Sequence, residues 1–240
     1  MKKQKVRYAA LFFSMLLFPV TIYYLSPYLI IQAGFSGIIS GSFVFFAVLF
    51  LSSLIFGRAY CGWLCPAGGL QRICAQINGK PASPKMNKIK IFIWIPWLIA
   101  IVSGFIAAGG IKSFDPFYLT DHGISVANIY GYIIYFFIVG LVLLLSLILG
   151  RHAFCHSLCW MAPFMMLGTK LKNELKYPSL NLRAYPEKCV SCGRCDRNCP
   201  MSLEVGRMVK TRKMENSECI LCGECENACR NGAVKLNFKR

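Results

Sequence analysis

Hydrophobic residues dominate three long stretches that carry no Asp, Glu, Lys, Arg or His: residues 8–57, 91–111 and 123–150. About 20 apolar residues in a helix, each rising about 1.5 Å, cross the hydrocarbon core of a bilayer. The first stretch is long enough for two such helices, with polar and helix-breaking residues at 26–36 between them. The pattern therefore predicts four transmembrane helices, near residues 8–26, 36–56, 91–111 and 129–150.

A cysteine pattern occupies the C-terminal part, where the run C-x2-C-x2-C-x3-C occurs twice. With this spacing, three thiolates of a run bind one [4Fe-4S] cluster and the fourth binds the other cluster. One cluster is accordingly assigned to Cys189, Cys192, Cys195 and Cys229. The second cluster is assigned to Cys219, Cys222, Cys225 and Cys199.

Zinc and disulfides are the other common uses of such cysteines. A zinc ribbon needs four ligands per ion, and the third and fourth cysteines of each run exceed that need. A disulfide framework is typical of small secreted domains, and nothing in this chain indicates that compartment. Two [4Fe-4S] clusters are therefore the preferred interpretation.

The predicted membrane part consists of two repeats of helix, outer loop, helix and C-x3-C motif. The motif is Cys61 and Cys65 in the first repeat and Cys155 and Cys159 in the second, each after a Gly-Arg pair. Cysteines four residues apart lie on one face of a helix. The second and fourth predicted helices are expected to be neighbours in a two-repeat bundle, which would bring the four thiols together. Such a set favours a third iron–sulfur or metal centre. Redox-active thiols and plain packing remain open as alternatives, and packing is the expectation for Cys74.

Two short strands are expected around the cluster motifs, because residues 180–183 and 234–238 alternate apolar and polar side chains. Residues 170–188 indicate a polar tether. The predicted fold class is a membrane α-helical protein with a four-helix transmembrane domain at 1–170. A bacterial-type 2[4Fe-4S] ferredoxin-like α+β domain follows at 171–240.

The distribution of charge predicts the orientation of the chain in the membrane. The chain carries 27 Lys and Arg against 10 Asp and Glu, a formal net charge of +17. The basic residues gather before the first predicted helix, between the second and third, and after the fourth, which places both termini and the ferredoxin domain on the cytoplasmic side of the cell membrane. Anionic lipid is the expected partner of this charge, and a tail tethered to four helices disfavours nucleic acid.

Two residue types limit the other chemistry. The only histidines are His122, His152 and His156, and no two lie within the predicted helices, which excludes a buried bis-histidine haem. Arg58 and Arg151 end their helices, where an arginine reaches lipid headgroups more often than it forms a quinone or anion site.

The Gly-Arg-x2-Cys-Gly-Trp-Leu-Cys-Pro repeat, followed by the double cluster motif, resembles the NapH-like family of membrane iron–sulfur proteins. This group includes quinol dehydrogenase subunits and the C-terminal half of NosR. The chain departs from the pattern after Cys159, where Trp160 to Ala162 precede the proline. The resemblance implies electron transfer between the quinone pool and a partner reductase or cytochrome.

Three functions follow as hypotheses. The first is a membrane-bound electron-transfer subunit with quinone as its substrate. The second is an iron–sulfur reductase that acts in metal or cofactor maturation of another enzyme, although methionine is absent from the predicted outer loops. The third is a non-catalytic anchor or redox sensor.

Overall fold

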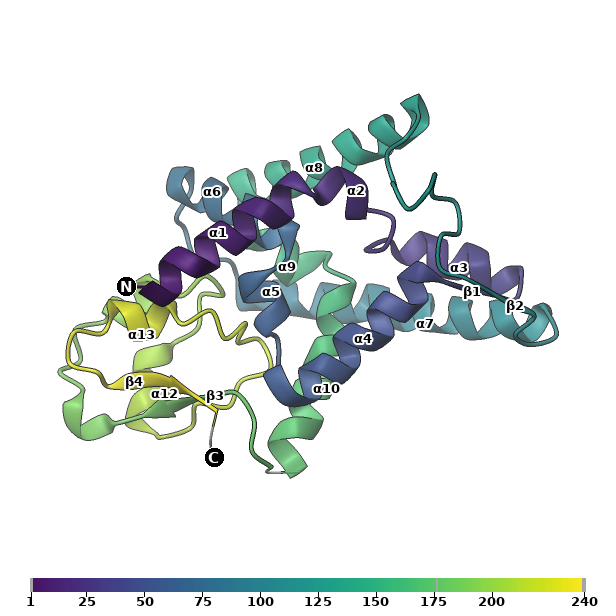
Figure 1. Ribbon diagram of the computed structural model, residues 1–240. Helices are drawn as coiled ribbons and strands as arrows, with labels where there is room; N and C mark the ends of the chain where they lie inside the picture. Colours follow the sequence, from purple (N-terminus) through teal and green to yellow (C-terminus); the bar gives the residue numbers. More distant parts are fainter. Residues whose placement is uncertain (1, 176, 239–240) are drawn as a thin grey trace.

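The computed structural model describes residues 2–175 and 177–238, and helices form most of it (Figure 1). The N-terminal part contains α1 (Lys2–Leu16), α2 (Phe18–Thr21), α3 (Pro27–Phe35), β1 (Ile38–Ser40), α4 (Gly41–Phe56), α5 (Ala59–Trp63), α6 (Pro66–Ile77), the 3-10 turn η1 (Pro84–Met86), α7 (Asn87–Ala107), β2 (Ser113–Asp115), α8 (Ile129–Leu149), α9 (Ala153–Ser157) and α10 (Met161–Leu175). The C-terminal part contains β3 (Asn181–Ala184), the 3-10 turn η2 (Pro186–Lys188), α11 (Arg194–Arg197), α12 (Val205–Lys210), α13 (Glu224–Ala228) and β4 (Val234–Asn237).

The prediction of four transmembrane helices is wrong. Within the described residues, two helical segments are long and apolar enough to cross a membrane by length and composition: Pro84–Ala107 and Ile129–Leu149. They correspond to the third and fourth predicted helices. The first two predicted helices are interrupted or too short.

The first apolar stretch breaks at Leu17. Helix α1 begins at Lys2 and ends at Leu16, and a separate turn of helix follows at Phe18–Thr21. Pro19 lies in the first turn of α2 and has no backbone N–H to donate, so it favours a new helix start over a continuation of α1.

The second predicted helix loses its first turn to a strand. Ile38 to Ser40 form β1, which pairs in parallel with β2 from the other outer loop. Helix α4 therefore starts at Gly41, and its 16 residues span about 24 Å, less than the ~30 Å of a bilayer core. The Ser40 hydroxyl caps this start by accepting from the N–H of Phe43 at 3.4 Å.

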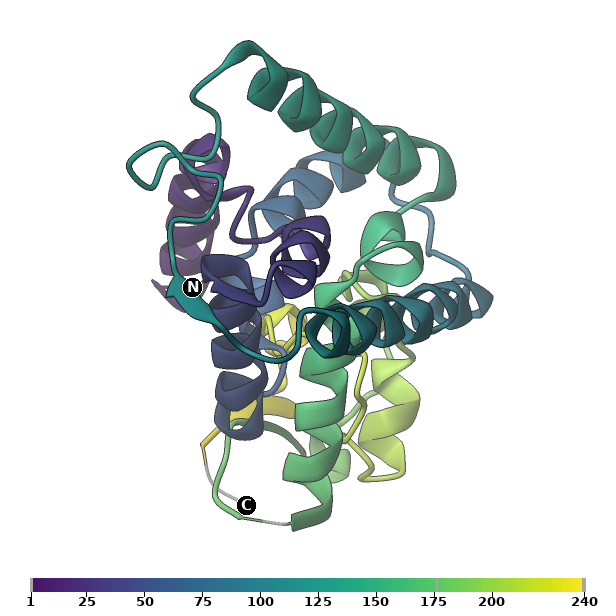
Figure 2. The same ribbon diagram turned by 90° about the vertical axis from the view of Figure 1, so that its right-hand side faces the viewer.

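The two repeats exchange their last helices. Helix α10 of the second repeat packs against α4 of the first, while α6 of the first repeat packs against α8 of the second. Figures 1 and 2 show α4 and α10 side by side. The expected direct contact between the second and fourth predicted helices, α4 and α8, is not among the main contacts of the described residues. The repeats are joined instead by the packing of α10 on α4 and of α6 on α8.

The C-terminal part contains the two predicted strands. Strands β3 and β4 pair antiparallel, with Asn181 opposite Asn237 and Ala184 opposite Val234. The expected polar tether begins inside α10, which continues to Leu175. The predicted domain boundary at residues 170 and 171 therefore falls within a helix, and the division itself stays a prediction.

Candidate functional site

Four cysteines surround a cavity at the surface of the C-terminal part, which we call the surface set. The cavity has a volume of about 450 Å³, and its wall includes Cys189, Cys192, Cys195 and Cys229. Cys192 is exposed and the other three are partly buried. The N–H of Ala233 donates to the Cys229 sulfur at 3.2 Å. The structure thus brings these four predicted residues to one space.

A second group, the inner set, lines a narrower cavity whose other walls are mostly apolar: Cys199, Cys219, Cys222 and Cys225. All except Cys219 are buried. The N–H of Leu203 donates to the Cys199 sulfur at 3.4 Å. Cys199 therefore lies with the thiols of the other run, in the crossed grouping expected from the sequence.

The two C-x2-C loops have matching backbones. Ser191 and Leu221, each just before the second cysteine of its run, have φ angles of 57° and 47°. The glycine after that cysteine is also left-handed, with φ of 66° at Gly193 and 72° at Gly223. Turns with left-handed residues can direct successive N–H groups to one side and favour an anionic group there. Non-glycine residues held in this region cluster at functional sites.

These features fit iron–sulfur clusters. All thirteen cysteines are free thiols, and each set offers four of them around a cavity. In the described residues, no three His, Cys, Asp or Glu side chains form a group for a single metal ion. A bound [4Fe-4S] cluster supplies one-electron transfer. That these eight residues bind two clusters stays a prediction.

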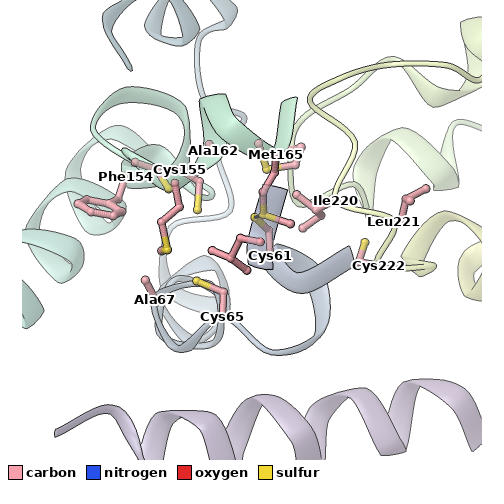
Figure 3. Packing of buried hydrophobic residues seen from close by; sticks show 14 of the residues in the cluster. Cys61, Cys65, Ala67, Phe154, Cys155, Ala162, Met165, Ile220, Leu221 and Cys222 are labelled. Atoms are coloured by element: carbon pink, nitrogen blue, oxygen red, sulfur yellow. Dashed lines mark hydrogen bonds between the residues drawn. The ribbon is translucent and has the colours of Figure 1, made fainter. Parts of the chain in front are cut away.

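The C-x3-C motifs form a third group, the helix set. Cys61 lies in α5 and Cys65 at the N-terminus of α6, while Cys155 lies in α9 and Cys159 just before α10. The expected continuous helix is absent because α5 and α9 are single turns that end between the two cysteines. All four are buried, and Figure 3 shows Cys61, Cys65 and Cys155 in one region of the packed interior.

Polar and sulfur contacts surround the helix set. Gln71 donates through Nε2 to the Cys155 sulfur at 3.1 Å and accepts from the Cys155 N–H at 3.3 Å. Gln71 has no exposed surface. The Cys61 sulfur lies 3.6 Å from the Met165 sulfur. A buried glutamine that bonds the same cysteine twice fixes the position of that thiol.

The four thiols differ in acidity. A shared hydrogen bond lowers the pKa of Cys159 and raises that of Cys155, and the positive charge of Arg58 adds to the lowering at Cys159. Burial raises the pKa of Cys61 and Cys65. Metal or cluster binding removes these protons, so the set can hold either thiols or a ligated centre.

Arg58 connects the helix set to the C-terminal part. Its side chain has no exposed surface, and it donates to Glu218 at 2.8 Å and to the carbonyl of Ser217 at 3.2 Å. Lys90 pairs with the same carboxylate at 2.6 Å. Although burial opposes it, Arg58 and Lys90 hold the pKa of Glu218 below its usual value. The expected role of Arg58 as a headgroup anchor is therefore wrong, because its partner is a carboxylate.

Two further nitrogens of Arg58, Nε and Nη2, are buried without a hydrogen-bond partner in the described part of the chain. Cys61 and Cys159 lie near enough for their charges to raise the pKa of Arg58, against the opposing effect of burial. A buried guanidinium with unused donors beside four thiols fits an anionic centre there.

The helix set and the inner set are in direct contact through the C-x3-C loop. A side chain built on Gly62 would meet the Ile220 carbonyl at 2.4 Å and Cys222 Cβ at 3.2 Å. The Trp63 indole donates to the Leu221 carbonyl at 3.1 Å. Figure 3 shows Cys222 beside Ile220 and Leu221 and near Cys61. Glycine between the two cysteines therefore permits the inner loop to approach.

Helix α1 holds the same loop from the other side. Gln4 and Arg7 donate to the Cys222 carbonyl at 3.0 and 2.9 Å. Arg7 and Arg72 both pair with Glu224, at 3.0 and 2.8 Å. No motif in the sequence indicated that these side chains hold the Cys222 loop. The scarcity of acidic residues could have pointed to these contacts. Glu218 and Glu224 are two of only ten Asp and Glu residues, and each directly precedes a predicted cysteine ligand.

An apolar cavity of about 550 Å³ adjoins the helix set, because Cys65 is one of its lining residues. Ala67, Phe18, Ile134 and Ile138 are among the apolar residues along its walls. Its polar lining residues include Tyr23, Gln32 and Asn128. A mainly apolar cavity with a few polar groups is typical of sites for small hydrophobic ligands.

Comparison with protein families identifies iron–sulfur domains in this chain. Residues 39–84 and 130–178 match the 4Fe-4S binding domain family, and each segment contains one C-x3-C motif. Residues 155–234 match the 4Fe-4S dicluster domain family, which covers all eight C-terminal cysteines.

Curated relatives are similar at low identity. The uncharacterised protein MJ0749 of Methanocaldococcus jannaschii is 27% identical, covering 77% of this chain and 66% of the relative. The putative electron transport protein YccM of Escherichia coli K12 is 24% identical, covering 68% and 47%. The methylamine utilization ferredoxin-type protein MauN of Methylorubrum extorquens is 26% identical, covering 72% and 59%. The aligned part thus spans about half to two thirds of these relatives.

No solved structure matches the chain significantly. The domain matches, the electron-transport and ferredoxin-type relatives, and the grouped free thiols agree with one another. The chain therefore carries iron–sulfur domains of the 4Fe-4S ferredoxin type.

Proposed function

We propose that this protein carries electrons between quinones of a membrane and a partner redox protein, as its resemblance to NapH-like proteins implies. One observation carries the proposal: the helix set contacts the inner set through Gly62 and the Cys222 loop. The C-terminal part also holds the surface set, whose Cys192 reaches solvent. Short separations favour electron transfer, and the contact between the helix set and the inner set supplies one.

The helix set is proposed to bind a third iron–sulfur centre. Support comes from the four buried thiols, the unused donors of Arg58, and the 4Fe-4S family match over both motifs. A thiol pair alone needs no such doubled arrangement. The residues that would hold the centre are Cys61, Cys65, Cys155 and Cys159.

The quinone is proposed to bind in the apolar cavity that Cys65 lines. The cavity volume of about 550 Å³ lies within the usual range for sites of small hydrophobic ligands. A quinone ring bound there would lie near the proposed third centre, because Cys65 lines the cavity. The polar residues Gln32 and Asn128 offer amide groups to a quinone carbonyl.

A membrane location is proposed through α7 and α8. Their most apolar windows are only 17% and 11% buried within the protein, whereas a core helix of the same composition would be mostly buried. Exposed apolar helices of this length favour contact with lipid. The segment before α7 carries Lys80 and Lys85, and Lys88 follows in the first turn of α7, as expected for the cytoplasmic end of a helix.

The test compares two neighbouring residues of α8 in the anaerobically purified full chain. Ile134 lines the cavity and Ile133 does not, although both are exposed to a similar extent. Ile134→Trp should slow reduction by duroquinol about five- to 150-fold, from an overpacking penalty of about 1–3 kcal/mol. Ile133→Trp should leave the rate unchanged. Dithionite reduction, followed by EPR, should be the same in both variants, and equal duroquinol rates would refute the quinone site.

A further inference from the structure

The three thiol sets differ in their access to solvent. The helix set is buried and so is most of the inner set, whereas Cys192 of the surface set is exposed. Val190, which lines the same cavity, is 67% exposed. A soluble partner can therefore approach closely at the surface set.

The rim of this cavity is strongly basic. Five cations line it: Lys188, Arg194, Arg207, Lys210 and Arg230. One carboxylate, Asp196, lines it as well, and it accepts from the Gly206 N–H at 2.7 Å. The charge of Arg207 is partly offset by an exposed pair with Glu204 at 3.3 Å. An apolar residue and an exposed thiol thus line the same cavity as five cations.

We propose that this basic rim is the docking surface for a small acidic redox protein, one whose own redox centre is surrounded by carboxylates. Opposite charges orient such a partner and raise its association rate, while a small apolar contact excludes water at the centre. Val190 supplies that contact beside Cys192. The inference rests on the proposed function, because it names the partner at the solvent end of the same protein.

A simpler role for these cations is to stabilise the negative charge of a cluster bound by the surface set. That role predicts a change in reduction potential when they are removed and no dependence on a partner. Docking predicts the opposite: a change in binding and association rate with the potential retained. The two roles are therefore separated by measuring both quantities.

The experiment uses the full chain and a purified flavodoxin of strongly negative net charge as the probe. Isothermal titration gives its Kd at low and high salt. Carbodiimide, which joins lysines to carboxylates in contact, followed by mass spectrometry identifies the lysines at the interface. We expect cross-links at Lys188 and Lys210, and a Kd that rises at least about tenfold with salt because the attraction is screened.

The decisive variant is Arg194→Glu with Lys210→Glu. The matched control is Lys5→Glu with Lys170→Glu, which makes the same change in net charge at exposed lysines far from this cavity in the sequence. The first pair should weaken flavodoxin binding at least about tenfold, and the control should weaken it far less. Iron content and EPR of both variants establish that the protein is intact. If the first pair does not fold, Arg194→Gln with Lys210→Gln is used in its place.

Equal binding by both variants overturns the proposal, as does absence of binding by the wild-type chain. Binding of anionic phospholipid vesicles at these residues, without flavodoxin binding, assigns the surface to lipid and also overturns it. A changed reduction potential with unchanged flavodoxin binding assigns the cations to the cluster. Failure of the duroquinol assay alone leaves docking supported, because the titration and the cross-links do not depend on quinol oxidation.

Discussion

Arg58 is enclosed completely, yet its charge is matched by a carboxylate from a residue 160 positions away. A buried cation is costly unless it is paired and hydrogen-bonded. Glu218 is itself held by Arg58 and Lys90, so three charges of distant origin meet beside the helix set. At the residue scale, this contact helps to attach the second cysteine run, residues 219–229, to the helices of the N-terminal part.

Replacing Arg58 by Gln should destabilise the protein by about 3 kcal/mol, because Glu218 loses one of its two buried cationic partners. Lys90 remains beside the carboxylate and keeps the loss at the lower end of the range for a broken buried pair. Anaerobic urea unfolding followed by circular dichroism measures the change. The control is Arg151→Gln, the equivalent residue of the other repeat, whose bond to the Arg197 carbonyl is exposed. Equal losses of unfolding free energy in the two variants would contradict the buried ion pair between Arg58 and Glu218.

The crossed grouping of cysteines gives a second prediction at this scale. Cys199→Ser should damage the cluster of the inner set, although Cys199 belongs to the first run in the sequence, because its sulfur shares a cavity with Cys222 and Cys225. EPR of the reduced variant shows which signal disappears. Cys229→Ser is the reciprocal control and should affect the surface set. Loss of the surface-set signal in Cys199→Ser is the result that disproves the grouping.

At the element scale, each C-x3-C motif lies across the junction of two helices. Gly57 and Gly150, with φ of 55° and 104°, end α4 and α8 in conformations that favour glycine. A single-turn helix follows each glycine, and the next helix packs on the other repeat. This exchange brings the two motifs together, although α4 and α8, the helices that precede them, are not a main contact among the described residues.

The contact between α5 and the Cys222 loop should fail when Gly62 gains a side chain. The added methyl of Gly62→Ala would lie 2.4 Å from the Ile220 carbonyl, which is backbone and cannot rotate away. We expect a loss of about 1–3 kcal/mol, typical of overpacking. Gly140→Ala is the control, because a Cβ there meets nothing within 4 Å. Chemical unfolding compares the two, and a neutral effect at Gly62 contradicts the close approach.

At the scale of the whole molecule, iron content tests the third centre. Three [4Fe-4S] centres correspond to about twelve iron atoms per chain, and two correspond to about eight. Cys61→Ser with Cys155→Ser should therefore lose about four iron atoms and retain those of the other two sets. Cys74→Ser is the control, since Cys74 is buried and lies outside all three sets. Assays of iron and acid-labile sulfide under argon are made on the double variant and on the control. Unchanged iron in the double variant would leave only redox-active thiols or plain packing as interpretations of the helix set.

The sequence by itself indicated the local features. The spacing of the two four-cysteine runs predicted which thiols share a cavity, because loops of two or three residues leave little freedom to the sulfurs. Alternation at 180–183 and 234–238 predicted the paired strands, since side chains in a strand alternate between faces. Two uninterrupted apolar stretches predicted α7 and α8, with boundaries that moved by only a few residues.

Tertiary structure decided where the apolar helices break and which distant residues meet. Apolar composition does not distinguish a helix that crosses a bilayer from shorter pieces broken by Pro19 or by the pairing of β1 with β2. The bond between Arg58 and Glu218 and the approach of Gly62 to Cys222 join residues about 160 positions apart, and no local periodicity encodes them. The exchange of α6 and α10 between repeats follows from which apolar faces fit together. Such contacts depend on the packing of the whole chain, so they became visible only in three dimensions.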